Sequence, residues 1–381
     1  MSPEIIRDLG HRNSINQWYY YQTFTVISSM NTSVENKSRK AVALVSGGLD
    51  SMLAVKVIQD QGIHVEGINF FTGFCVEGHT HAIRKKDRAR PKRNNALWTA
   101  EQLGIKLHII DVSEPYKDVV INPKHGYGAN LNPCLDCKGF MVQRAYAWMQ
   151  EHDFDFLITG EVMGQRPMSQ RKDTMPVVSR ESGAGDLLLR PLCAKLLPET
   201  KPEREGWVNR DELLDFSGRN RKPQMALAAS YGIEDYAQPA GGCCFLTDAS
   251  YSSKLADLWQ ARGEKTYEID DIVMLKVGRH LRPRDNFKII IAREEGETNF
   301  LKGYRKRFLS LGTTSHTGPI ALIDGEPSET DLELAARLVA RFSSGRDADS
   351  VTVEVLQKDG TSSTFDVQPL PSNEVPQDWY V

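Results

Sequence analysis

Two glycines, an acid and two hydroxyls follow an apolar run near the start of the chain. The string SGGLDS covers residues 46–51, after KAVALV and before an apolar, helix-like segment. Paired glycines let a backbone turn sharply and approach a ligand closely. The successive N–H groups of such a turn, at a helix N-terminus, form a site for an anion. The alternative is an ordinary strand-to-helix turn, but the full string in this setting predicts a phosphate-binding loop.

Six cysteines form the second chemical feature. Cys134 and Cys137 make a CxxC, and the doublet Cys243-Cys244 follows much later in the chain. A chain of 381 residues does not need disulfides, so we expect a reducing, cytoplasmic setting with some thiols used for chemistry. Zinc takes four ligands, yet two adjacent cysteines rarely both bind one zinc. The remaining two cysteines, Cys75 and Cys193, are interpreted as packing residues.

The segments around these motifs alternate between strand-like and helix-like patterns. Short apolar runs indicate strands, and longer amphipathic runs that end at glycine indicate helices. The expected order is strand 40–45, helix 50–62, strand 64–71, helix 94–104, strand 106–113, helix 139–152 and strand 154–162. This order predicts an α/β fold with a doubly wound parallel sheet, whose ligands bind at the carboxyl ends of the strands. The SGGLDS loop follows one such end.

Composition divides the chain further. Residues 1–38 are predicted to be a poorly ordered N-terminal extension, residues 39–250 the nucleotide-binding domain, and residues 265–381 a smaller, basic α+β domain. The last domain carries a hairpin signal at Asp359-Gly360 and an amphipathic helix at 329–342. No run of 18 apolar residues appears, and no clear cleavage site follows the tyrosine-rich start, so neither a membrane span nor a signal peptide is expected.

Basic residues are concentrated in two stretches of a chain whose formal net charge is −3. Residues 81–93 hold seven Lys or Arg against one acid, and residues 276–309 hold ten against four, interleaved with aromatic residues. A solvated face is the usual meaning of such runs, and the first stretch is alternatively a loop over a nucleotide. Segregated charge in an acidic chain nevertheless favours nucleic-acid phosphates as partners.

Four motifs in one order carry a resemblance to a known family. SGGLDS resembles the PP-loop of the ATP pyrophosphatase superfamily. NPCLDCKGFMVQRA (132–145) is similar to the CxxC segments of tRNA 2-thiouridylases and tRNA 4-thiouridine synthetases. ITGEVMGQRPMSQ (158–170) and GGCCFLTD (241–248) resemble a nucleotide-bordering segment and a sulfur-carrying segment of the 4-thiouridine synthetases. No THUMP or rhodanese-like module of that family is evident, and the C-terminal part resembles the RNA-binding module of the NFACT proteins.

The resemblance implies a tRNA sulfurtransferase that uses ATP. The residues implied to bind ATP and Mg²⁺ are Ser46, Gly47, Gly48, Asp50, Ser51, Gly160 and Gln165. No lysine stands where a Walker loop has one, which suits a loop that holds pyrophosphate as a leaving group. A uracil carbonyl would be adenylated and its oxygen replaced by sulfur, giving 4-thiouridine or 2-thiouridine in tRNA. The catalytic residues implied are Asp50, Cys134 and Cys244.

The sulfur chemistry is left between alternatives. Cys134, Cys137 and Cys244 would hold a [4Fe–4S] cluster with one open iron, as in related thiolases. Alternatively, one cysteine carries a persulfide that a second cysteine resolves, or the thiols hold a structural zinc or are inert. The sulfur donor is sulfide or a persulfide-carrying protein. The rival functions are a PP-loop ligase that forms amides on a small molecule, and a nucleotide- or RNA-binding protein without catalysis.

Overall fold

The computed structural model describes residues 38–76, 93–237 and 243–381. The predicted N-terminal extension and most of the basic stretch 81–93 lie outside the described residues. The chain divides into two compact units. Unit 1 comprises residues 1–70, 96–111 and 138–238, and unit 2 comprises 71–95, 112–137 and 239–381. The domain bounds drawn from the sequence stay a prediction.

Unit 1 is built on a five-stranded parallel sheet with the order β3-β2-β1-β4-β5. The strands are β1 (Lys40–Leu44), β2 (His64–Phe71), β3 (Leu107–Asp111), β4 (Phe156–Thr159) and β5 (Leu188–Leu189). In the central strand, Leu44 is in register with Ile68 of β2 and Thr159 of β4. The strand order reverses between β1 and β4. The loops that follow these two strands therefore flank the position where open α/β sheets bind their ligands.

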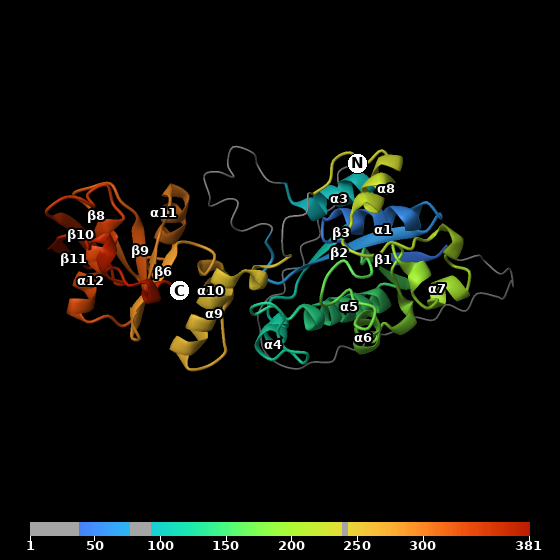
Figure 1. Cartoon of the computed structure of the whole chain (residues 1–381), viewed down its shortest axis with the longest axis horizontal. Helices are drawn as coiled ribbons and strands as arrows, with labels where there is room; N and C mark the ends of the chain where they lie inside the picture. Colours follow the sequence, from blue (N-terminus) through green and yellow to red (C-terminus); the bar gives the residue numbers. More distant parts are fainter. Residues whose placement is uncertain (1–37, 77–92, 238–242) are drawn as a thin grey trace, which may run out of the picture. The chain divides into compact units, whose positions relative to one another are not determined.

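Helices cover both faces of this sheet (Figure 1). One face carries α1 (Leu49–Gln59), α3 (Asn95–Leu103) and α8 (Lys222–Ser230), and the other carries α5 (Cys134–Glu151) and α6 (Met175–Glu181). A shorter helix of unit 1 is α7 (Lys201–Arg204), and α4 (Tyr116–Ile121) belongs to unit 2. The predicted doubly wound α/β fold is confirmed. Only α5 departs from the predicted bounds by much, since it begins at the CxxC itself.

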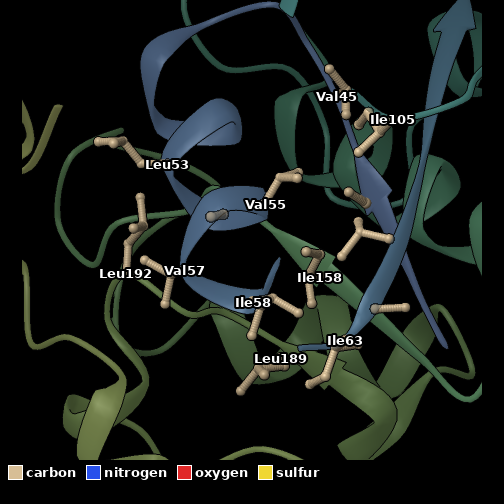
Figure 2. Packing of buried hydrophobic residues seen from close by; sticks show 14 of the residues in the cluster. Val45, Leu53, Val55, Val57, Ile58, Ile63, Ile105, Ile158, Leu189 and Leu192 are labelled. Carbon is tan, nitrogen blue, oxygen red and sulfur yellow. The ribbon is translucent and has the colours of Figure 1, made fainter. Parts of the chain in front are cut away.

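The core of unit 1 holds α1 against the sheet. Val55 and Ile58 of α1 pack with Ile158 of β4 and Leu189 of β5, and all four side chains are almost completely buried (Figure 2). Each such side chain stabilises the fold by about 1.5–3 kcal/mol on burial. Because α1 is anchored along its length, the loop that precedes it is held in a fixed position.

Unit 2 contains a six-stranded antiparallel sheet with the order β11-β10-β8-β9-β7-β6. The strands are β6 (Arg279–Arg284), β7 (Phe287–Ile291), β8 (Leu309–Thr313), β9 (Ile320–Gly325), β10 (Val351–Leu356) and β11 (Ser362–Val367). The helices are α9 (Ala249–Arg262), α10 (Ile269–Met274), α11 (Glu295–Lys302) and α12 (Glu329–Arg341). The predicted α+β character is confirmed. In Figure 1 this sheet is drawn in orange and red, with α12 beside it.

Local sequence signals explain three of these elements. Ser328 and Asp331 form a capping box that starts α12, and Gly360 takes a positive φ of 91° in the β10–β11 hairpin. Glu268 and Asp271 likewise form a capping box, which starts α10. Within the described residues, no helix is both long enough and apolar enough to cross a membrane.

A buried ion pair links the segments after β4 and β5. Glu161 is 1% exposed, and its Oε2 accepts hydrogen bonds from Arg190 Nε at 3.0 Å and Thr159 Oγ1 at 2.8 Å. Arg190 also donates to Ser179 Oγ and to the Met175 carbonyl. Burial acts to raise the pKa of Glu161, but the charges of Lys138 and Arg190 and the hydrogen bonds outweigh it, so the pKa is lowered.

We expect Glu161→Gln to lower the free energy of unfolding by about 3–5 kcal/mol at pH 7, because it leaves a buried guanidinium without its counter-charge. The matched control is Glu199→Gln, since Glu199 is 54% exposed and lies 3.9 Å from Arg210. An exposed pair of this kind contributes less than about 1 kcal/mol. Urea denaturation of both variants measures the difference. Equal effects of the two substitutions would contradict the role given to the buried pair.

The same pair predicts a pH dependence. The folded-state pKa of Glu161 lies below its ordinary value, so its contribution is complete above the unfolded pKa of about 4.3 and is lost as the pH falls through the folded pKa. The gap in unfolding free energy between the wild type and Glu161→Gln should therefore narrow on acidification from pH 7 to below pH 4. If this difference in unfolding free energy instead widened on acidification, the lowered pKa of Glu161 would be contradicted.

Candidate functional site

The loop between β1 and α1 has the geometry of an anion-binding turn. Gly47 has a φ of +79°, a left-handed conformation that glycine adopts without strain. Gly48 is the N-cap of α1, and no side chain caps the helix there. Ser51 Oγ donates to the Gly48 carbonyl at 2.8 Å and lies 3.5 Å from Ser46 Oγ. A helix N-terminus without a side-chain cap can receive an anion, and Ser46 is exposed beside it.

The segment that leaves β4 packs directly on this loop. A Cβ added at Gly160 would lie 2.4 Å from the Asp50 carbonyl carbon and 2.5 Å from the Ser51 nitrogen, too close for any side chain. Gly160 is therefore required for the approach of two backbones. Gln165, five residues later, donates from Nε2 to Asp50 Oδ2 at 2.7 Å. The structure thus brings together the seven residues that the resemblance implied for ATP.

Two further residues of this site were missed in the sequence. Arg221 precedes α8, and its Nη2 lies 3.5 Å from Asp50 Oδ1. Gln224, fully buried in α8, donates from Nε2 to Gln165 Oε1 at 3.0 Å. An isolated parallel bridge between Gly48 and Ala237 also joins the segment after α8 to the loop. No motif marks these positions, because they reach the loop only through the packing of α8.

The predicted sulfur residues Cys134, Cys137 and Cys244 belong to unit 2. Cys134 and Cys137 occupy the first turn of α5. Cys244 forms an isolated antiparallel bridge with Cys75, beside a hydrogen bond from the Phe245 N–H to the Phe74 carbonyl at 2.9 Å. Cys75 was interpreted as a packing residue, yet this bridge sets it next to a proposed sulfur residue. Of the doublet, Cys244 is half-buried and Cys243 is exposed.

The thiols of unit 2 influence one another. Burial, with smaller contributions from Cys243, Cys134 and Cys75, raises the pKa of the Cys137 thiol to about 12, although a hydrogen bond with Tyr116 acts to lower it. A hydrogen bond with Cys243, followed by burial and nearby thiols, raises the pKa of Cys244 well above its ordinary range. In this arrangement both groups are neutral thiols at pH 7, because one thiolate would disfavour its neighbours.

A buried lysine interacts electrostatically with two of these thiols, Cys75 and Cys244. Lys276 is 4% exposed, donates from Nζ to the Gly73 carbonyl at 2.6 Å and lies 4.8 Å from the centre of the Phe245 ring. Burial lowers the pKa of Lys276 to about 8, while Cys75 and Cys244 act in the opposite direction. Cys193, by contrast, is fully buried in unit 1 and donates from Sγ to the Glu161 carbonyl, as a packing residue would.

The predicted cluster ligands Cys134, Cys137 and Cys244 do not form a metal site among the described residues. Among the described residues, no three His, Cys, Asp or Glu side chains are grouped as ligands of one metal ion. Thiols are the donors that an iron–sulfur cluster uses, but the structure does not assemble Cys134, Cys137 and Cys244 into a ligand set. The cluster stays a prediction.

The basic stretch 276–309 is less available than its composition indicates. Arg282 and Lys288 both bind Asp257, Arg293 binds Glu297, and Arg307 binds Asp270. These cations hold unit 2 together. Lys302 and Lys306, around the end of α11, are exposed and form no ion pair among the described residues. The aromatic residues of the stretch also contribute to packing: Phe287 is fully buried, and Phe300, Tyr304 and Phe308 pack on the core.

Family models match both parts of the chain. Residues 39–177 match the tRNA methyl transferase HUP domain, and residues 278–380 match the NFACT protein RNA binding domain. The first match contains the SGGLDS loop, the CxxC and Gly160-Gln165. The second covers β6 to the end of the antiparallel sheet.

Curated relatives are tRNA-specific 2-thiouridylases. The chain is 31% identical to MnmA of Sulfurimonas denitrificans over 131 residues, which are 32% of this chain and 34% of that protein. It is 22% identical to MnmA of Christiangramia forsetii over 323 residues, 76% of this chain and 75% of that protein. The chain thus spans about a third of the length of the first relative and three quarters of the second.

Among solved structures, a 4-thiouridine synthetase in complex with RNA and bound ATP is 22% identical to this chain. The match covers 41% of this chain and 37% of that one, at a TM-score of 0.31, which is too low to support a conclusion. The motifs, the parallel sheet and the family models all indicate the same resemblance. The chain resembles the tRNA thiolase branch of the PP-loop ATP pyrophosphatase superfamily, and its C-terminal part resembles the NFACT RNA-binding domain.

Proposed function

We propose that this protein is an ATP-dependent tRNA sulfurtransferase that converts a uridine carbonyl into a thiocarbonyl. The observation that carries the proposal is the phosphate loop at the strand-order reversal, with Asp50 held by Gln165 and Gly160 packed on its backbone. The similarity to tRNA-specific 2-thiouridylases and the C-terminal match to an RNA-binding domain give the substrate class.

In the first step, the carbonyl oxygen of a uracil attacks the α-phosphorus of ATP. A uridine–AMP bond forms, and pyrophosphate leaves. The residues proposed to hold the phosphates are Ser46, Gly47, Gly48 and Ser51, with N–H groups at the α1 N-terminus stabilising the developing negative charge. Asp50 would hold Mg²⁺, which would neutralise phosphate charge when bound. Gly160 and Gln165 keep Asp50 in position.

In the second step, sulfur attacks the activated carbon and AMP leaves with the original oxygen. With sulfide as donor, the exchange needs no electrons from outside. With a persulfide, one cysteine forms a bond to the base through sulfur, and a second cysteine must release the thiouridine as a disulfide forms. Cys134 and Cys244 are the proposed catalytic thiols. The target base must leave any stack to reach them, as in other enzymes that act on bases.

We expect Asp50→Asn to reduce pyrophosphate release, with ATP and tRNA present, by at least about 100-fold, because a metal-binding carboxylate is lost. Cys244→Ser is the matched control: it should release pyrophosphate normally but form no thiouridine in nucleoside mass spectrometry. Ser46→Ala should also reduce pyrophosphate release, but by a smaller factor than Asp50→Asn. If Asp50→Asn released pyrophosphate at the wild-type rate, the proposed role of the loop in the first step would be wrong.

The iron content of protein purified without oxygen tests the prediction of a [4Fe–4S] cluster. Protein purified without oxygen should be brown and carry about four irons per chain, the stoichiometry of a [4Fe–4S] cluster. Cys137→Ser should lose this iron, whereas Cys193→Ala should keep it, because Cys193 lies in unit 1 and contacts Glu161. Colourless anaerobic protein that thiolates tRNA fully from a persulfide donor would favour the persulfide route instead.

For tRNA binding, the exposed cations Lys302 and Lys306 should matter. We expect Lys302→Glu with Lys306→Glu to weaken tRNA affinity at least about tenfold and to make the salt dependence shallower by about two counterions. The matched control is Arg346→Glu with Lys358→Glu, which changes the same net charge at exposed positions of unit 2. Filter binding at several salt concentrations measures both effects. Equal losses in the two double variants would indicate a general charge effect only.

A further inference from the structure

Arg221 is held next to the phosphate loop by a chain of polar contacts within unit 1. Gln224 donates to Gln165, Gln165 donates to Asp50, and Asp50 lies 3.5 Å from Arg221. Gln224 is fully buried and stands three residues after Arg221, on the first turn of α8. The guanidinium therefore lies beside the Asp50 carboxylate, close to the phosphate loop.

The polar groups of this contact are incompletely satisfied. Arg221 Nε is buried without a hydrogen-bond partner among the described residues, and so is Asp50 Oδ1. The 3.5 Å separation between Arg221 Nη2 and Asp50 Oδ1 is long for a charge-assisted hydrogen bond, which spans about 2.7–2.9 Å. Leaving a buried charged group unsatisfied is unfavourable, and native proteins rarely keep one without a function.

The location indicates what satisfies these groups. Arg221 stands beside the uncapped N-terminus of α1, and the segment after α8 is bridged to Gly48 of the loop itself. A planar guanidinium with several donors matches phosphate oxygens better than any other cation does. Arg262, by contrast, makes two hydrogen bonds to Asp271, each of 2.8 Å.

We propose that Arg221 is a further phosphate-binding residue of this site and contacts the polyphosphate of the nucleotide. On binding, the guanidinium moves from Asp50 to a phosphate oxygen, which frees the Asp50 carboxylate for the cation that accompanies the nucleotide. Gln165 and Gln224 keep the carboxylate in place during this exchange. The inference rests on the proposed function, because it assigns a residue to the same ATP site.

Calorimetric binding of ATP, inorganic pyrophosphate and adenosine to the full chain tests the assignment. Arg221→Gln should weaken ATP and pyrophosphate about 10- to 100-fold, as expected for a lost charged hydrogen bond, and leave adenosine unchanged. Arg221→Lys should recover part of the loss, because it keeps the charge but not the planar fork. Arg219→Gln, an exposed arginine two residues earlier, should bind all three like the wild type.

The outcomes distinguish a failure of the Arg221 assignment from a failure of the proposed function. A wild-type protein that binds ATP, with Arg221→Gln and Arg221→Lys binding ATP and pyrophosphate equally well, overturns the role of Arg221 and leaves the proposed function standing. A wild-type protein that binds neither ATP nor pyrophosphate overturns the proposed function and this inference together. Equal weakening of adenosine and pyrophosphate in Arg221→Gln also overturns the inference, because it indicates a general disturbance of the site.

Discussion

The approach of two backbones at Gly160 is the constraint on which the site of unit 1 depends. With no room for a Cβ above the Asp50–Ser51 peptide, the segment leaving β4 can lie directly on the first turn of α1. That contact sets Gln165 within hydrogen-bonding distance of Asp50, and Gln165 in turn connects to α8 through Gln224. The parallel pairing of β1 with β4 makes the approach possible, since both strands end at the same edge of the sheet. A buried pair just beyond it, Glu161 with Arg190, fixes the segment from the other side.

The parts of this arrangement that are local in sequence could be predicted. SGGLDS shows its own turn and helix start, and alternating apolar runs indicate a parallel sheet. Arg221 could not be found this way, because nothing near it in sequence marks a ligand-binding position and only the packing of α8 brings it to Asp50. The composition of the basic stretch 276–309 overstates its unpaired positive charge for a related reason: Asp257 and Asp270 lie outside it in sequence, yet they pair with Arg282, Lys288 and Arg307 in the fold.

The thiols of unit 2 show a different physical situation. Cys75, drawn beside Cys244 by a single antiparallel bridge, adds a thiol to a region where Cys137 and Cys244 already have raised pKa values. Neutral thiols packed together are poor nucleophiles, since the thiolate is the reactive form. The proposed sulfur transfer therefore depends on something that stabilises negative charge on sulfur. Lys276, buried against Gly73 and close to Phe245, is a nearby positive charge that could contribute to this stabilisation.

The central claim is that a uridine carbonyl oxygen is activated by AMP and leaves with it. The most direct measurement uses tRNA transcribed with ¹⁸O at one uracil carbonyl, incubated with the protein, ATP and sulfide. Mass spectrometry of the products follows the label. The account predicts one thiouridine, one AMP and one pyrophosphate per turnover, with the ¹⁸O in the phosphate of AMP, and the labelled position identifies the ring carbon. Thiouridine formed while the AMP carries only ordinary oxygen would contradict the account.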